Sequence, residues 1–537
     1  MTIAEIVFEV GFQRGSWGIQ RGSFLHMNRS FLTIVPLVAI LCNSQAAKRP
    51  NILFAISDDQ SHVHTSAMGY KAIHTPGFDR VAKSGVMFKN AFAPSPGCSP
   101  TRAAFLTGRH TWQIEQAGTH ASSFPEKYVV FSDLLEKAGY FVGVTGKAWG
   151  PGNFKISGRK RNPAGPSYTK HKAKPPFKGI SSNDYASNFE DFLEARPDDR
   201  PFYFWYGASE PHRSFEKGAG LKSGKRLEDI VVPPFLPDTR EIRSDIADYL
   251  VEIEHFDKHL VRMLNALEKA GELENTLVIV TSDNGMAFPR AKANLYDYGF
   301  HMPLAISWGA EVPGGRVVED VVGFVDITAT ILDAAQVTFP KDRPALAGRS
   351  IVDLLKKKGS GRLDPSRKYV YAGRERHSSS RWNNNTYPQR AIRSQDYLLI
   401  RNFHPERWPA GTPQKFEANG ELGPEHGGYH DIDACPSLSF LIANRDHPEI
   451  GKYFHWAVDH RPEWEMFDTN KDPGCLVNLA EDPAHKKEFK KLSRQLNKYL
   501  KESGDPRMNG NGDIWEKYKR YSRIRSFPEP EWAKGNR

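Results

Sequence analysis

Pro50-Asn51-Ile52-Leu53-Phe54-Ala55-Ile56-Ser57-Asp58-Asp59 is the stretch from which the fold can be worked out. Its residues from Ile52 to Ile56 are all apolar, and two carboxylates follow within three positions. A short run that is apolar on both faces is typical of a strand in a sheet covered on both sides. The stretch therefore predicts a buried strand that ends at Asp58 and Asp59.

Three further stretches repeat this pattern of an apolar run that ends in polar residues. They are Phe141-Val142-Gly143-Val144 before Thr145-Gly146-Lys147, Phe202-Tyr203-Phe204-Trp205-Tyr206 before Glu210-Pro211-His212, and Leu277-Val278-Ile279-Val280 before Ser282-Asp283-Asn284-Gly285. Apolar residues at helical spacing lie between the last two runs, from Ile246 to Leu267, and Gly271 ends that helix. The alternation predicts an α/β fold with a mainly parallel central sheet flanked by helices. In such sheets the site lies beyond the carboxyl ends of the strands, where all four polar groups fall.

The pattern changes after about residue 390. Short stretches typical of antiparallel strands follow, and a helix with apolar residues at 489, 492, 496 and 500 comes after them. We therefore expect a smaller C-terminal α+β subdomain with an antiparallel sheet. The predicted division is a catalytic domain at 48–390 and a C-terminal subdomain with a tail at 391–537. The strand stretches are Arg390-Ala391-Ile392-Arg393, Tyr397-Leu398-Leu399-Ile400-Arg401 and Trp464-Glu465-Met466-Phe467-Asp468.

The N-terminal region has the layout of a secretory signal peptide at 27–47. Met27-Asn28-Arg29-Ser30 precedes an apolar run from Phe31 to Cys42, and small residues suited to cleavage follow. Residues 1–26 then form an upstream extension. A membrane anchor is the alternative, but the run is short for a span, so we expect no stable membrane span. The layout predicts export to a periplasmic, secreted or lysosome-like compartment.

Composition narrows the class of protein. Hydrophobic residues make up 39% of the 537 residues and charged residues 25%, as in an ordinary globular protein. The formal charge is +10, and residues 155–178 contain eight lysines and arginines without an acid. Such a loop attracts polyanions, although a merely solvated loop is the alternative. Nucleic acid is not expected as a partner because no recognition motif accompanies the charge.

A cysteine motif begins at residue 98. Cys98-Ser99-Pro100-Thr101-Arg102 continues as Ala103-Ala104-Phe105-Leu106-Thr107-Gly108-Arg109. Pro100 suits the first turn of a helix, and the apolar residues can continue that helix. The amides of the first turn and Arg102 would then face an anion that meets Cys98. The other exported cysteines are Cys435 and Cys475, which could form a disulfide in an oxidising compartment.

Asp58, Asp59, Asp283 and Asn284 offer hard oxygen ligands from two strand ends. Such a set suits Ca²⁺ or Mg²⁺ rather than Zn²⁺, because no histidine or cysteine cluster accompanies it. Taken alone, an Asp-Asp pair after a strand is more often a turn or a helix cap. The joint appearance with the Cys98 motif favours a metal site.

The chain resembles the formylglycine sulfatases of the alkaline phosphatase superfamily. Within them it is most similar to the heparan N-sulfatases, also called N-sulfoglucosamine sulfohydrolases or sulfamidases. The resemblance covers roughly residues 48–505 and implies an alkaline-phosphatase-like sandwich. Besides the Cys98 motif, it rests on Glu210-Pro211-His212-Arg213, Val232-Pro233-Pro234-Phe235-Leu236-Pro237-Asp238-Thr239, Thr281-Ser282-Asp283-Asn284-Gly285 with Phe288-Pro289, Ala293-Asn294-Leu295-Tyr296, and Asp472-Pro473 with Asn478-Leu479-Ala480.

The resemblance implies a role for each residue of the motif. A maturation enzyme oxidises Cys98 to formylglycine, whose hydrate attacks sulfur and later expels sulfate. Ca²⁺ binds through Asp58, Asp59, Asp283, Asn284 and the modified residue 98. Arg102, Lys147 and Lys292 spread positive charge over the sulfate oxygens, and His212 protonates the leaving nitrogen or oxygen. Without the resemblance, Lys147 and Lys292 read as loop lysines and His212 as a structural histidine.

One position departs from the family pattern. Many sulfatases carry a histidine two positions after the lysine that matches Lys147, and this chain has Trp149 there. That histidine serves as the base in sulfate release. Either another group replaces it, or release is slow, or the chain is partly degenerate. His301 and His377 are the candidate replacements.

The substrate is a sulfated saccharide by the same resemblance, with N-sulfoglucosamine of the heparan type favoured. Arg374-Glu375-Arg376-His377 falls where related enzymes place substrate contacts, although a solvated loop is the alternative. An O-sulfatase on another polysaccharide, or a phosphodiesterase or phosphonate hydrolase of the same superfamily, remains open. A non-catalytic binder of sulfated glycan is the third hypothesis, motivated by Trp149 and the basic loop.

Overall fold

The computed structural model describes residues 49–197 and 200–534. The expected upstream extension and signal peptide at 1–47 lie outside these residues. Within the described ranges, no helix combines the length and the apolar character needed to cross a membrane.

A seven-stranded sheet in the order β3-β4-β1-β5-β6-β2-β7 forms the centre of the molecule. All pairs are parallel except those of β6, which runs antiparallel to β5 and β2. This confirms the predicted α/β fold with a mainly parallel sheet. The strands are β1 (Asn51–Ser57), β2 (Val86–Phe92), β3 (Phe141–Gly146), β4 (Phe202–Gly207), β5 (Thr276–Ser282), β6 (Leu304–Ser307) and β7 (Arg316–Gly323).

The register brings four strand ends to one edge. Ser57 of β1 pairs with Ser282 of β5, and Gly146 of β3 pairs with Gly207 of β4. Ile56 of β1 also lies opposite Gly207. Because these strands are parallel and in step, the polar residues that follow them meet at the same end of the sheet.

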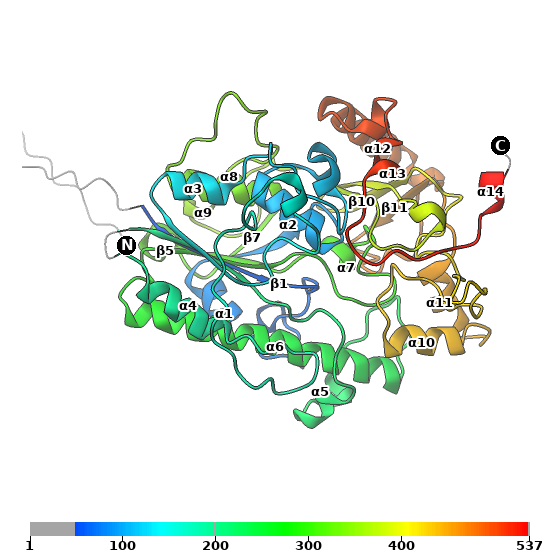
Figure 1. Cartoon of the computed structure of the whole chain (residues 1–537), viewed down its shortest axis with the longest axis horizontal. Helices are drawn as coiled ribbons and strands as arrows, with labels where there is room; N and C mark the ends of the chain where they lie inside the picture. Colours follow the sequence, from blue (N-terminus) through cyan, green and yellow to red (C-terminus); the bar gives the residue numbers. More distant parts are fainter. Residues whose placement is uncertain (1–48, 198–199, 535–537) are drawn as a thin grey trace, which may run out of the picture. The chain divides into compact units, whose positions relative to one another are not determined.

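Helices cover both faces of the sheet (Figure 1). Helices α1 (Pro76–Ser84), α4 (Tyr185–Glu194) and α6 (Arg240–Lys269) lie on one face, and α2 (Cys98–Thr107), α3 (Phe131–Lys137) and α8 (Val325–Ala334) on the other. Alternate residues of β1 pack against the helices on the two faces of the sheet. Leu53 belongs to the apolar cluster that includes α6, and Phe54 makes an edge-on contact with Phe105 of α2. Burying a large apolar side chain contributes about 1.5–3 kcal/mol, so both faces stabilise the sheet.

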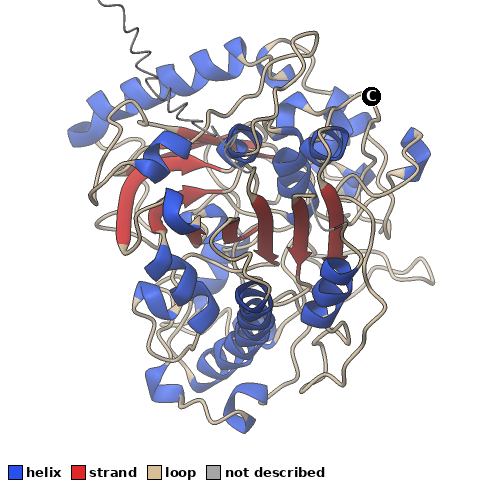
Figure 2. Ribbon diagram, turned by 90° about the vertical axis from the view of Figure 1, so that its left-hand side faces the viewer, coloured by secondary structure: helices blue, strands red, loops and turns tan. Residues whose placement is uncertain are grey.

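A second sheet of four antiparallel strands lies in the C-terminal part, in the order β11-β10-β9-β8. Its strands are β8 (Val370–Arg374), β9 (Gln389–Arg393), β10 (Tyr397–Asn402) and β11 (Trp464–Asp468). Helix α12 (Lys486–Glu502) packs on this sheet, with Leu496 in one apolar cluster with Leu399. The antiparallel sheet is thus confirmed, and its strand β8 precedes residue 390. Figure 2 shows the strands between the helices that cover them.

The remaining helices are short. They are α5 (Ala219–Lys222), α7 (Asp297–Phe300), α9 (Val352–Lys356), α10 (Pro436–Ala443), α11 (Gly451–Val458), α13 (Ile514–Lys517) and α14 (Glu531–Lys534). The tail from residue 505 onward is largely irregular but runs back along the protein, and Trp515 is buried in it. Cys435 and Cys475 are both free thiols, so the disulfide considered from the sequence does not form in this structure.

Candidate active site

Four acidic or amide side chains gather where β1 and β5 end. The Asp283 amide donates to the Ser57 carbonyl (3.2 Å), and the Asp59 amide donates to Asp283 Oδ1 (3.2 Å). Asn284 Nδ2 in turn donates to Asp59 Oδ1 (2.7 Å). Asp58, Asp59, Asp283 and Asn284 are all fully buried. The structure thus brings together the four oxygen ligands expected from the sequence.

This group of side chains suits a divalent cation. Ligand atoms of Asp58, Cys98 and Asp283 lie within 4.8 Å of one another. Asp58 Oδ1 and Asn284 Oδ1 are buried and have no hydrogen-bond partner among the described residues. Buried acceptors without partners are costly, and a cation would satisfy both. Oxygen donors of this kind fit Ca²⁺ or Mg²⁺.

The negative charges of these buried carboxylates also repel one another. Burial and the neighbouring Asp58 raise the pKa of Asp283 to about 7, and burial raises the pKa of Asp59 as well. Burial acts in the same direction on Asp58, but Lys147, His212 and Arg102 together hold its pKa below the usual range. Three buried carboxyls at one point are therefore stable together only with compensating positive charge.

Helix α2 begins at Cys98, with Gly97 at its N-cap and Pro100 in the first turn. Cys98 is 1% exposed. Burial, joined by the charge of Asp58, raises the pKa of its thiol to about 11. A thiol with a raised pKa is a poor nucleophile.

Three cations surround the carboxylates. Arg102 Nε donates to Asp283 Oδ2 (2.7 Å), and its Nη1 donates to the Lys147 carbonyl (2.6 Å). Lys147 Nζ donates to Asp58 Oδ2. Lys292 Nζ bridges Asp59 Oδ2 (2.7 Å) and Asp433 Oδ2 (2.8 Å). Arg102 Nη2 remains buried without a hydrogen-bond partner among the described residues, so the site keeps a donor for an anion.

His212 lies beside the same cluster. Its Nδ1 donates to the Arg213 carbonyl (2.7 Å), because a carbonyl can only accept. A ring nitrogen lies within 4.8 Å of carboxylate oxygens of Asp59 and Asp433. The side chain is partly exposed, unlike the carboxylates.

Two residues of this site were not found from the sequence. Asp433, between β10 and α10, reaches Lys292 as described above, and it is 29% exposed. His120 lies in the loop after α2, and its Nε2 is 3.2 Å from Cys98 Sγ. Neither belongs to a recognisable motif, because each reaches the site through tertiary packing alone.

Trp149 is buried next to the backbone at the start of α2. Its indole Nε1 donates to the Ser99 carbonyl (3.1 Å), and its ring packs edge-on against Phe124. Trp149 thus supports the backbone beside Cys98 and offers no base. Burial and nearby charges lower the pKa of His377 to about 3, and its ring lies against His120 (centroids 4.6 Å apart).

The suggestion that His301 replaces the missing histidine is corrected by the structure. Its Nδ1 contacts Asp297 Oδ2 (3.0 Å), and its Nε2 donates to the Lys89 carbonyl (2.6 Å). Its ring stacks on His62 with centroids 3.7 Å apart. Both nitrogens are thus engaged away from Cys98.

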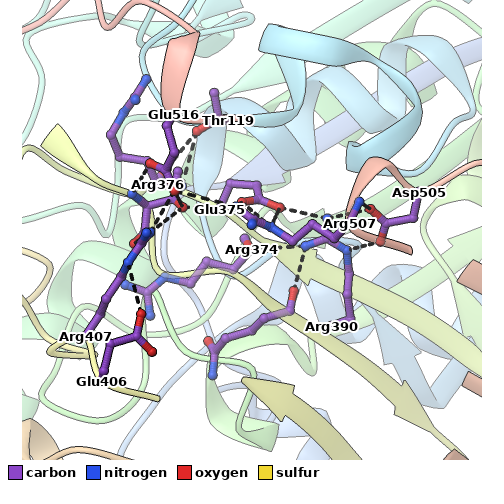
Figure 3. A network of polar contacts seen from close by, with 12 residues as sticks. Thr119, Arg374, Glu375, Arg376, Arg390, Glu406, Arg407, Asp505, Arg507 and Glu516 are labelled. Atoms are coloured by element: carbon purple, nitrogen blue, oxygen red, sulfur yellow. Dashed lines mark hydrogen bonds and ion pairs between the residues drawn. The ribbon is translucent and has the colours of Figure 1, made fainter. Parts of the chain in front are cut away.

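Four consecutive residues that were expected to contact the substrate are buried and lie at and after the end of β8. They are Arg374, Glu375, Arg376 and His377. The Glu375 carboxylate is paired with Arg390 and Arg507 (Figure 3), Arg374 is paired with a buried carboxylate, and one nitrogen of Arg376 donates to a backbone carbonyl. This explains why a stretch that reads as a solvated loop is buried. The partners are Asp431 for Arg374 (2.6 Å), Arg390 (2.7 Å) and Arg507 (2.6 Å) for Glu375, and the Tyr518 carbonyl for Arg376 (2.8 Å).

The basic loop at 155–178 is largely exposed. Part of its charge is neutralised locally, since Arg161 pairs with Glu136 (2.5 Å) and Arg159 with Asp133 (3.4 Å). Lys155, Lys160 and Lys174 lie on the surface. Their charge is exposed in the segment that follows Lys147 in the sequence.

Comparison with known families agrees with this geometry. Residues 50–337 match the sulfatase family, and residues 290–409 match the family described as N-sulphoglucosamine sulphohydrolase, C-terminal. The first match covers more than half of the chain. The chain therefore belongs to the sulfatase family and is a hydrolase of that class.

Individual relatives extend the comparison. The chain is 29% identical over 509 residues to the N-sulphoglucosamine sulphohydrolase of Homo sapiens, covering 88% of this chain and 93% of that protein. It is 25% identical over 487 residues to an ulvan-active sulfatase of Formosa agariphila, covering 85% and 76%. A solved structure in complex with its substrate D-glucosamine-2-N,6-O-disulfate shares the fold, with a TM-score of 0.59, 22% identity, and coverage of 88% and 100%.

Proposed function

We propose that this sulfatase removes sulfate from a sulfated saccharide, with N-sulfoglucosamine of the heparan type as the favoured substrate. The main observation behind the proposal is that Cys98 lies next to Asp58 and Asp283. These two carboxylates pair with the cations Lys147 and Arg102 at one end of the sheet. The match of residues 290–409 to the family described as N-sulphoglucosamine sulphohydrolase, C-terminal, supports the choice of substrate.

Asp58, Asp59, Asp283 and Asn284, with residue 98, would hold Ca²⁺ or Mg²⁺ through their oxygens. With formylglycine derived from Cys98, the site supplies a hydrated aldehyde as the nucleophile and a cation that polarises the sulfate. Arg102 orients Asp283, and its Nη2, which makes no hydrogen bond within the part of the chain that the structure describes, would donate to the anion. Its guanidinium is fixed in place by the Lys147 carbonyl.

Lys147 and Lys292 place positive charge on the two sides of the carboxylates. Such preorganised charges stabilise the negative charge that develops on transferring oxygens. His212, partly exposed and with Nδ1 donating to a carbonyl, is placed to give a proton to the leaving nitrogen or oxygen. Asp433 sits beside it and orients Lys292.

The proposal implies a cellular context. A maturation enzyme that oxidises Cys98 is the required protein partner, and the layout of 27–47 favours an exported protein. We also retain the division into a catalytic domain at 48–390 and a C-terminal part at 391–537. The exposed lysines of 155–178 would attract a polyanionic glycan.

The decisive experiment measures free sulfate after incubation with defined saccharides. Glucosamine with only an N-sulfate is compared with N-acetylglucosamine carrying only a 6-O-sulfate. Sulfate release from the first substrate supports the proposal. A Cys98→Ala variant is the matched control and should release none. No release from either substrate by protein whose residue 98 is shown by peptide mass to be formylglycine would refute it.

An O-sulfatase acting on another polysaccharide is the second candidate, since an ulvan-active sulfatase is among the relatives. Release from the 6-O-sulfated sugar alone would favour it. A phosphodiesterase or phosphonate hydrolase would turn over a bis-aryl phosphate faster than an aryl sulfate. Salt-sensitive heparin binding with unmodified Cys98 and no turnover would instead indicate a glycan binder.

A further inference from the structure

His120 is held rigidly by three segments that are far apart in sequence. Its own amide donates to the Arg376 carbonyl (3.1 Å). The next amide, of Ala121, donates to Ser99 Oγ (3.1 Å), directly beside Cys98. The Tyr521 amide donates to the Ala121 carbonyl (2.6 Å). The loop after α2, the end of β8 and the C-terminal tail therefore fix this imidazole relative to residue 98.

Arg520 selects the tautomer of His120. Arg520 Nη1 lies 3.4 Å from His120 Nδ1 and donates to the His377 carbonyl at 2.9 Å. A guanidinium has only donors, so Nδ1 must present its lone pair to Arg520. The proton of the neutral ring is then on Nε2, which is the nitrogen 3.2 Å from Cys98 Sγ. Among the described residues, no other side chain makes a hydrogen bond to this sulfur.

The surroundings disfavour a second proton on the ring. The Arg520 guanidinium faces Nδ1, and the ring of His377 lies against the imidazole with centroids 4.6 Å apart, so neither neighbour accepts a proton from Nδ1. Asp58 and Asp283, the acids nearest Cys98, are already paired with Lys147 and Arg102. The imidazole is therefore a neutral donor toward residue 98.

We propose that His120 is a positioning residue that donates an Nε2–H hydrogen bond to an oxygen of the oxidised residue 98. Cys98 Sγ stands in for one of the two oxygens on the same carbon after oxidation and hydration. The hydrogen bond selects the rotamer in which the other oxygen faces the carboxylates and the substrate. This inference rests on the proposed oxidation of Cys98.

Trp149 is directed away from the side chain of residue 98. Its indole is directed to the Ser99 carbonyl, so the Lys147–Trp149 segment supports the backbone but does not hold the side chain of residue 98. His120 reaches residue 98 from the side of the C-terminal tail instead. Because Nδ1 faces Arg520, His120 serves as a donor and not as the base.

The first test compares two variants of the full-length, oxidised protein. His120→Gln keeps an N–H donor near the position of Nε2, whereas His120→Leu keeps bulk without a donor. Loss of one preorganised donor costs about 10²–10³-fold in turnover. We expect kcat to fall about 10²-fold in His120→Leu with KM within about threefold, and His120→Gln to recover most of it. Peptide mass must show equal oxidation of residue 98 in all three proteins.

The second test needs no turnover. In protein labelled with ¹⁵N-histidine, long-range ¹H–¹⁵N spectra distinguish the Nε2–H from the Nδ1–H tautomer, and the signal missing in His120→Gln assigns His120 among the 19 histidines. We expect the Nε2–H tautomer in the wild type and a shift toward Nδ1–H in Arg520→Met.

An Nδ1–H tautomer in the wild type would overturn the proposal, as would a His120→Leu variant with unchanged kcat or a His120→Gln variant as impaired as His120→Leu. If the wild type released no sulfate, the proposed function would fail, and the tautomer would still decide whether His120 is the donor.

Discussion

The buried carboxylates at the ends of β1 and β5 give the first prediction at the residue scale. Asp58 Oδ1 and Asn284 Oδ1 have no hydrogen-bond partner within residues 49–197 and 200–534, and the pKa of Asp283 is raised. A cation that binds only the folded state stabilises it by mass action. We expect millimolar Ca²⁺ or Mg²⁺ to raise the thermal midpoint of the chelator-treated protein, and Asp58→Asn to abolish most of this shift in differential scanning fluorimetry.

Asp326→Asn is the matched control for this measurement. Asp326 is a buried acid that pairs with Arg367 in a different part of the protein. Its loss lowers the midpoint itself, since breaking a buried pair is costly, but the shift on adding metal should persist. A metal shift of equal size in Asp58→Asn and the wild type would mean that the cation binds elsewhere.

At this scale, the sequence predicted residues that follow strands and residues that match the family motifs, and it missed two residues that reach the site from loops. Asp58 and Asp283 could be placed together because parallel strands end at one edge of a sheet. His120 and Asp433 follow no strand of the central sheet, and they contact Cys98 and Lys292 only because distant segments pack there. No periodicity or spacing encodes such contacts. The roles of the site residues remain predictions.

The junction between β3 and the segment carrying Lys147 gives a prediction at the scale of elements. Gly146 has φ +73, and a Cβ there would lie 2.1 Å from the Gly207 carbonyl oxygen of β4. A side chain must push the two strands apart and move Lys147, whose amide donates to that same carbonyl (2.6 Å). Gly146→Ala should lower both the free energy of unfolding and kcat.

Gly218→Ala is the control for Gly146→Ala, because it separates the cost of a left-handed backbone from the cost of the steric clash. Gly218 also has a positive φ (+81), but nothing lies within 4 Å of the Cβ position. It should lose only about 1–2 kcal/mol for the left-handed backbone, whereas Gly146→Ala should lose about 1–3 kcal/mol more from the clash. Urea unfolding measures both values. Equal losses would show that the β3–β4 contact relaxes freely.

Helix α6 carries a pH-dependent prediction. Glu252 is buried, its Oε2 has no hydrogen-bond partner among the described residues, and burial, with the charge of Glu210, raises its pKa to about 9. The unfolded value is about 4.3. Between these two pKa values, Glu252 keeps its proton in the folded state and loses it in the unfolded state. The free energy of unfolding of the wild type therefore falls as the pH rises through this range.

Glu252→Gln removes this titration. Its unfolding free energy should exceed that of the wild type by an amount that grows with pH between about 5 and 9, by on the order of 1 kcal/mol per pH unit. Urea unfolding at several pH values measures the difference. Parallel pH profiles for the two proteins would show that Glu252 is ionised in the folded state.

The elements themselves were predicted to different degrees. The runs that became β1, β3, β4 and β5 are apolar on both faces, which is a strong signal. The sequence did not predict β6, which has four residues, or β2 and β7, whose runs contain the charged residues Lys89, Glu319 and Asp320. It also missed β8. Short or edge strands owe their form to pairing with neighbours more than to their own composition.

At the scale of the whole molecule, the C-terminal tail contacts the loops that lie next to the site. It was expected to be irregular, and most of it is, but its residues contact the loop that carries His120. The Lys519 carbonyl accepts from Ser122 Oγ (2.7 Å), and the Tyr518 carbonyl accepts from Arg376 (2.8 Å). A segment without regular structure thus packs against the loop that carries His120, next to Cys98.

Removing this segment tests the connection. In a chain that ends after Lys517, the contacts of Arg520 and Tyr521 with the His120 loop are lost, while both sheets and α12 remain. We expect far-UV circular dichroism close to that of the full chain and kcat lowered at least tenfold, in proportion to the loss of a positioned donor. A chain that ends after Pro528 is the matched control, because it lacks only α14 and the last residues. It should retain full kcat, and equal kcat in the two truncated chains would show that the tail does not support the site.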